Sequence, residues 1–283
     1  MALPDRFHIA WVNFLQSLTL ASSVAAEAEY PLTNLLSEKV GDKCRIDVSG
    51  ISPGTLSITW SSAVAYKVNC FALKDFNMTE GFTVNRRLFE GENQTGTEHA
   101  SGAIAIERAL PWDEAREGIP ANYGHYVPGS TIKTVFSNWF DQVAIKSGQI
   151  DIAVPAVNSG YLDLGKLFLS WAFTPTDNYE WGAGQEVRNN NASLKGDGLV
   201  IIPQPADRKL TVDFAAAGDE DKELLGFIKS QAMEFGGDLL VTLNPNAVGW
   251  DRVNVTSIYK QTNGVQFTEL ISGVDHSFVL EEN

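Results

Sequence analysis

Alternation of apolar and polar residues dominates the first part of the chain. Residues 55–61 place Leu56, Ile58 and Trp60 on one face and Ser or Thr on the other, which is the period of a half-buried strand. Residues 67–76 carry apolar side chains on both faces, as expected for a strand covered by two layers.

Further segments repeat this period. Residues 82–90, 148–156 and 161–173 also read as strands, and Gly and Asn occur in the turns between strands. Many short strands with such turns are typical of a β-sandwich or jelly roll. The chain is therefore predicted to be mainly β, with an N-terminal β-sandwich or jelly roll.

The last part of the chain shows a different pattern. Residues 208–216 alternate like a strand, and residues 218–237 then repeat apolar positions with a helical period. Residues 238–245 return as a strand, and Asn263–Gly264 marks a hairpin. This order predicts a small α+β domain with one helix. The apolar stripe of the helix consists of Leu224, Leu225, Ile228, Ala232 and Phe235.

A polar stretch rich in Asn and Gly, residues 185–198, is the predicted domain boundary. It divides the chain into an N-terminal sandwich with a linking arm at its end, residues 1–185, and an α+β domain, residues 186–283. Residues 7–28 could be an export signal or an opening strand, and the polar Asn13 within the segment favours the strand.

Composition excludes some classes of partner. The chain has 44% apolar residues, a formal net charge of -14 and a pI of about 4.7. Phosphate backbones and anionic lipid surfaces attract clustered Lys and Arg, so neither nucleic acid binding, general or sequence-specific, nor attachment to an anionic membrane surface is expected. No apolar run approaches the roughly 20 residues of a membrane span.

The sequence contains no recognisable motif for catalysis or for binding a metal or cofactor. The four histidines lack metal-ligand spacing, and neither a phosphate-binding glycine loop nor a dinucleotide motif occurs. Cys44 and Cys70 are not a C-x-x-C pair; we expect two buried thiols, with a disulfide as the open alternative. No metal, cofactor or enzymatic activity is predicted. Asp113, Glu114 and His125 remain the candidates if the chain is a carbohydrate-active enzyme.

Aromatic residues outside the expected strand interiors are the candidate binding residues. Trp112, Tyr123 and Tyr126 lie in a loop rich in Pro and Gly and could stack on sugars. Tyr179 and Trp181 lie on the predicted arm at 174–187, and Phe173 directly precedes it. These three form a second group, with the core of the sandwich as the open alternative for Phe173. Because Tyr179 and Trp181 stand among hydrophilic residues, this group is predicted to be buried against another domain or subunit.

The segments at 21–47, "ASSVAAEAEYPLTNLLSEKVGDKCRID", and 68–79, "VNCFALKDFNMT", carry one resemblance. Together they resemble discoidin-type, galactose-binding-like jelly rolls over about residues 20–175. The resemblance implies binding of glycans or lipids through loops at one end of the jelly roll.

A second resemblance covers most of the chain. It rests on "VNCFALKDFNMTEGFTVNRRLFEG" at 68–91, "LGKLFLSWAFTPTDNYEWGAGQE" at 164–186, and the strand, helix and strand between 208 and 245. These segments are similar to tail-tip proteins, that is distal tail or baseplate proteins, of bacteriophages with long non-contractile tails. In such proteins a tail-tube-like domain forms rings at the tail tip.

This second resemblance implies a non-enzymatic virion protein, made in the host cytoplasm and located at the tail tip. Its expected partners are copies of itself in a ring, with six as a candidate number, and the tail tube, tail hub and tape measure. The alternative is a glycan-binding adhesion module that recognises host-surface sugars through the jelly-roll loops.

Overall fold

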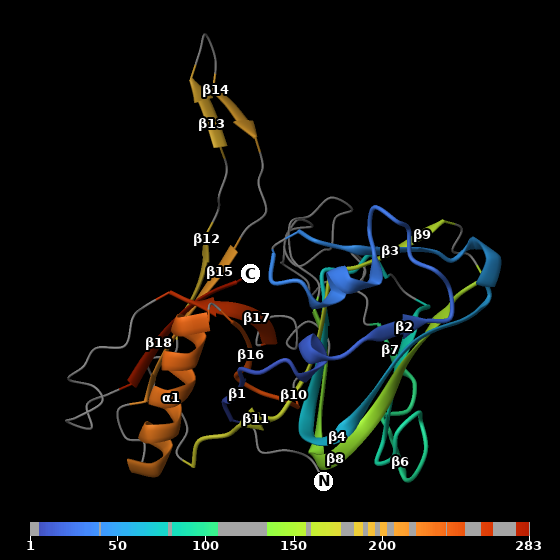
Figure 1. Ribbon diagram of the computed structural model, residues 1–283. Coiled ribbons are helices and arrows are strands. Elements are labelled where there is room, and N and C mark those ends of the chain that lie inside the picture. The colour runs from blue at the N-terminus through green and yellow to red at the C-terminus, as the bar shows by residue number, and fades with distance from the viewer. Residues whose placement is uncertain are drawn as a thin grey trace, which may run out of the picture.

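The computed structural model describes residues 6–39, 41–78, 81–106, 135–156, 160–176, 184–188, 192–195, 199–202, 207–214, 219–235, 237–246, 256–262 and 276–282 (Figure 1). This part of the chain is mainly β, with several antiparallel sheets and a single α-helix, so the predicted fold class is confirmed. None of the helices in it is long and apolar enough to cross a membrane.

Two long strands build the jelly roll. The first part of β4 (Gly54–Lys74) pairs with the end of β8 (Val135–Val154), and the second part of β4 pairs with the beginning of β8. The register shifts between Ser61 and Tyr66, and Figure 1 shows the paired strands doubling back there. One ribbon thus contributes to both layers of a sandwich.

Shorter strands extend both layers. β2 (Leu20–Ser22) and β5 (Thr83–Phe89) flank the ribbon in the first layer, β6 (Glu98–Ala100) and β7 (Ile104–Ala105) pair with β5, and β10 (Lys166–Ser170) joins the second layer. The alternation expected at 55–61 and 82–90 is confirmed, because Leu56, Ile58, Trp60, Val84 and Leu88 lie in the core between the layers.

A small sheet closes one end of this sandwich. It consists of β3 (Cys44–Asp47) and β9 (Tyr161–Leu164), and three short 3-10 helices accompany the jelly roll: η1 (Phe14–Ser17), η2 (Leu32–Leu36) and η3 (Ser49–Ile51). Leu35 of η2 packs into the same core as the apolar residues of the small sheet.

A second large sheet combines the two ends of the chain. In the described part its order is β11 (Ala172–Phe173), β1 (His8–Ala10), β16 (Asp238–Thr242), β17 (Thr256–Gln261), β18 (His276–Glu282), β15 (Asp207–Phe214) and β12 (Gly184–Arg188). An opening strand was one of the two alternatives for residues 7–28, and β1 is a strand within this segment. The predicted boundary after residue 185 falls inside β12, and the division into domains stays a prediction.

The second sheet has a covered face on each side. Helix α1 (Asp219–Phe235) buries Leu225, Ile228 and Ala232 against one face. On the other face, Leu240 and Ile258 meet Phe168 of β10 in the jelly roll. Helix, second sheet and jelly roll are thus successive layers, and the predicted apolar stripe of the helix is confirmed at its described positions.

Candidate functional site

Most residues singled out in the sequence lie outside the described part of the chain. This holds for Trp112, Tyr123, Tyr126, Tyr179 and Trp181. The acid pair Asp113 and Glu114, with His125, lies outside it as well.

Phe173 is described. It lies on β11 opposite Ile9, and its partly buried ring packs against the core between α1 and the second sheet. Three residues later, the Thr176 amide donates to Asp221 of α1 over 2.6 Å, so the start of the predicted arm contacts the helix layer.

The β3–β9 sheet presents a row of polar and aromatic side chains that the sequence reading did not identify. Along β3, Cys44 and Ile46 point into the core, and along β9, Leu162 and Leu164 do the same. Because successive strand residues face opposite sides, the residues between them share the outer face. The outer row consists of Arg45, Asp47, Tyr161 and Asp163, with Arg45 opposite Asp163 and Asp47 opposite Tyr161.

Arg45 and Asp163 form a two-pronged ion pair in this row. Nε of Arg45 donates to Oδ1 of Asp163 over 2.6 Å, and Nη2 donates to Oδ2 over 2.9 Å. The hydrogen bond from Arg45 holds the pKa of Asp163 below its ordinary value. This planar fork fixes both side chains in orientation.

Two tyrosine rings flank the guanidinium. Its carbon lies 4.6 Å from the ring centroid of Tyr30 and 5.6 Å from that of Tyr161. Two backbone hydrogen bonds hold the segment of Tyr30 against β3, from the Arg45 amide to the Tyr30 carbonyl and from the Glu27 amide to the Arg45 carbonyl. Tyr161 remains 51% exposed, so an aromatic ring is offered to solvent beside an ordered charged pair.

The side chain of Asn77 forms two hydrogen bonds with the backbone of β9. The Asn77 side chain donates to the Tyr161 carbonyl over 3.0 Å and accepts from the Asp163 amide over 2.9 Å. The Tyr161 backbone is therefore held in place although its ring is exposed. We refer to Tyr30, Arg45, Tyr161 and Asp163, with Glu27 and Asp47 at the rim, as the β3–β9 cluster.

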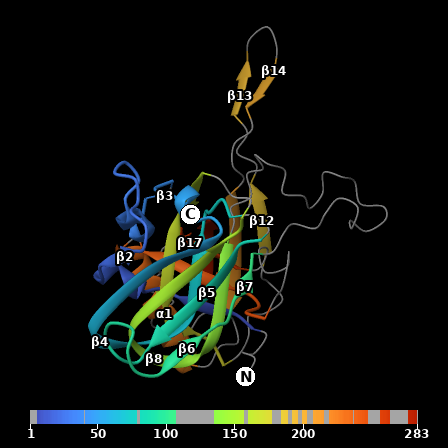
Figure 2. The same ribbon diagram turned by 90° about the vertical axis from the view of Figure 1, so that its right-hand side faces the viewer.

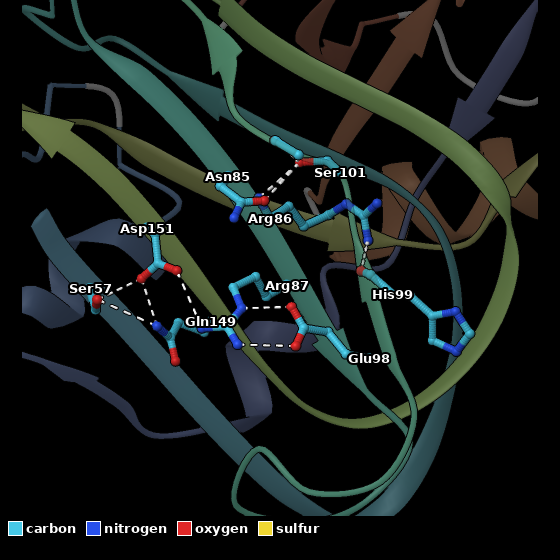
Figure 3. Close-up of polar contacts among 10 residues, drawn as sticks. Ser57, Asn85, Arg86, Arg87, Glu98, His99, Ser101, Gln149 and Asp151 are labelled. Carbon is cyan, nitrogen blue, oxygen red and sulfur yellow. Dashed lines mark hydrogen bonds and ion pairs between the residues drawn. The ribbon is translucent and has the colours of Figure 1, made fainter.

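A second polar group lies on the outer face of the first layer (Figure 3). Arg87 of β5 donates to Glu98 of β6 over 2.7 and 3.0 Å and lies 3.6 Å from Asp151 of β8. Asp151 also accepts from Ser57 over 2.5 Å and from Gln149 over 2.6 Å. Since these side chains satisfy one another, the group stabilises the sheet surface.

Arg86 is the neighbouring residue but points to the other side of β5. It is buried, donates to Asn138 over 2.9 Å and to the His99 carbonyl over 3.1 Å, and lies 3.8 Å from the ring centroid of Phe140. Burial lowers the pKa of Arg86 to about 10. This side chain joins the two layers of the sandwich and is shielded from ligands.

The cysteines and potential metal ligands form no reactive centre in the described part of the chain. Cys44 and Cys70 are free and buried, as the sequence favoured, and burial raises the pKa of Cys44 to about 12. No group of three or more His, Cys, Asp or Glu side chains there is placed to hold a metal ion.

Neither family models nor curated proteins match this chain. Among solved structures it is similar to a family 32 carbohydrate-binding module of NanJ from Clostridium perfringens in complex with galactose, at 14% identity and a TM-score of 0.38, covering 57% of this chain and 98% of the module. It is also similar to a chitosan-binding module of a chitosanase/glucanase from Paenibacillus sp. IK-5, at 9% identity and a TM-score of 0.38, covering 56% and 98%.

A third similar structure is the family 32 module of AlyQ in complex with 4,5-unsaturated mannuronic acid, at 9% identity and a TM-score of 0.36, covering 56% of this chain and 96% of the module. All three are sugar-binding modules by name, and they give no support to the phage-tail resemblance. At such low identities and TM-scores they assign no ligand to this chain, so a ligand must be inferred from its own residues.

Proposed function

We propose that the chain binds glycans through the β3–β9 cluster at one end of its jelly roll. The observation that carries this proposal is the half-exposed ring of Tyr161 beside the fixed pair of Arg45 and Asp163. An aromatic face packs against the apolar C–H face of a sugar, and fixed charged groups hydrogen-bond to its hydroxyls. The proposed function is binding alone, with no catalytic reaction.

A glycan array followed by isothermal titration calorimetry tests this function. Tyr161→Ala should weaken binding of the best array ligand by about tenfold, because the stacking surface is lost. Phe227→Ala on α1 is the matched control, since Phe227 is 50% exposed and belongs to another layer. The control should bind like the unaltered chain.

Two results would contradict the proposal. One is the absence of any array signal, and the other is a signal that Tyr161→Ala leaves unchanged. If Trp112→Ala or Tyr126→Ala abolishes that unchanged signal, glycan binding belongs to the loop predicted from the sequence and the β3–β9 cluster is excluded.

A second candidate function is structural assembly at a phage tail tip, and a projecting two-stranded sheet favours it. Beyond the pair β12 and β15, strands β13 (Ala192–Lys195) and β14 (Leu199–Ile202) form a separate two-stranded sheet. Both views show it projecting from the body of the molecule (Figures 1 and 2). A two-stranded sheet is marginally stable by itself in water, and β14 has the sequence Leu-Val-Ile-Ile, so a partner is expected to cover it.

In this candidate function the β13–β14 sheet joins copies of the chain in a ring that connects the tail tube to the tip. Deleting residues 192–202 should convert a self-associated species into a monomer in light scattering behind size-exclusion chromatography. Glycan binding by the jelly roll should persist in the same variant. A full-length chain that is monomeric at every concentration and absent from phage particles would exclude this role.

A further inference from the structure

The charges around the exposed Tyr161 ring are unequal. Three carboxylates belong to the β3–β9 cluster: Asp163 opposite Arg45, Asp47 opposite Tyr161, and Glu27, whose amide donates to the Arg45 carbonyl. The neighbouring cations are Arg45 and Lys43. Arg45 is already engaged by both oxygens of Asp163. The carboxylates that remain are those of the rim residues Glu27 and Asp47, and Lys43 offsets one of their two negative charges.

The titration behaviour of the rim agrees with this geometry. The negative charge of Glu27, a hydrogen bond with it, and the charge of Asp47 raise the pKa of Tyr161. Hydrogen bonds from Ser49 lower the pKa of Asp47, including one from the Ser49 amide over 2.9 Å, so Asp47 stays ionised near neutrality. The exposed ring thus lies in a negative potential, and its own π face also attracts cations.

We infer that the β3–β9 cluster prefers sugars that carry a protonated amine, such as glucosamine units, over their N-acetylated counterparts. The apolar face of the sugar would pack on Tyr161 while its ammonium group approaches Glu27 and Asp47. The net charge of -14 acts in the same direction, because it attracts cationic and repels anionic ligands. This inference rests on the proposed glycan-binding function and adds the chemical class of the ligand.

The test compares two probes of equal length, a glucosamine tetramer and an N-acetylglucosamine tetramer, by calorimetry with the full chain at a pH where the amine is protonated. We expect the glucosamine tetramer to bind about fivefold more tightly, as partly exposed charge pairs allow. Higher ionic strength should reduce this ratio, because salt screens exposed charges.

Isosteric variants locate the origin of the preference. Glu27→Gln combined with Asp47→Asn keeps the hydrogen-bond acceptors and removes the charges, so the ratio should fall to about one while binding of the N-acetylated tetramer stays unchanged. Glu92→Gln is the control for removing a carboxylate charge outside the cluster. Glu92 follows β5 at the other end of the sandwich, is paired with Lys146 over 3.3 Å, and its substitution alters net charge by one unit without touching the cluster.

The outcomes separate this inference from the proposed function. Equal affinity for both tetramers, or a preference that survives in the double variant, overturns the amine preference and leaves glycan binding intact. Absence of Tyr161-dependent binding to either tetramer and to every array glycan overturns both. Binding of a lysine-rich peptide without binding of any glycan overturns both in favour of a protein ligand.

Discussion

At position 148 of β8, the glycine lies directly opposite Trp60 of β4, and both residues face the jelly-roll core. A Cβ at this position would collide with the indole ring of Trp60. The ring is 3% exposed and surrounded by packed side chains, so it has little room to move.

Gly148→Ala should therefore lower the free energy of unfolding by about 1–3 kcal/mol, the range for overpacking a core. Urea denaturation followed by tryptophan fluorescence measures this loss. Gly50→Ala is the control, because nothing lies within 4 Å of a Cβ there. Equal stability of the two variants would show that the Trp60 ring relaxes without cost.

The candidate site depends on a contact between residues that are far apart in the sequence, and the sequence pattern alone does not predict such a contact. The alternation of apolar and polar residues typical of a strand is present in Lys43–Asp47 and in Tyr161–Leu164, since, for example, Cys44 and Ile46 alternate with charged residues. Nothing in either segment, however, indicates that Arg45 pairs with a residue 118 positions later. The sequence pattern instead favours the large aromatic residues in loops as binding residues, whereas Tyr161 stands at the start of a short strand.

At the scale of elements, the period of hydrophobic residues predicted the strands better than their length. The strand expected at 55–61 and the one expected at 67–76 are two parts of the single strand β4, Gly54–Lys74. Ser61, Ser62, Ala63, Val64 and Ala65 interrupt the alternation, and this interruption marks the bend at which the register shifts. Helix α1 was predicted closely, since acidic residues begin it and glycines follow Phe235.

At the scale of the whole molecule, sequence order was a poor guide to which layers form together. The segment containing β1 precedes the jelly roll in sequence but pairs with β16 in the second sheet, with Ile9 opposite Val241. The only sequence evidence available was local, and antiparallel pairing between segments more than 200 residues apart leaves no local signature. The apolar contacts between the layers could not be predicted either, because Ala72 and Leu240 have the pattern of any buried strand residue.

This joint predicts that jelly roll and second sheet unfold together. Phe168 on β10 is 1% exposed and packs with Cys70 and Ala72 on one side and with Leu240 and Ile258 on the other. Phe168→Ala should cost about 3–5 kcal/mol, because it leaves a cavity between the layers. Since β1 and β11 also tie the second sheet to the segments flanking the jelly roll, amide hydrogen exchange should show lower protection in both β4 and β16.

Leu225→Ala tests the same coupling from the far side, because Leu225 packs in the core between α1 and the second sheet. If the layers form one cooperative unit, the loss of amide protection caused by Leu225→Ala should extend past the Phe168 contacts to β4. Loss confined to β15, β16 and β18 would instead identify the second sheet and its helix as a unit that opens independently of the jelly roll. In that case the Phe168 contacts would act as a docking surface between two separately stable parts.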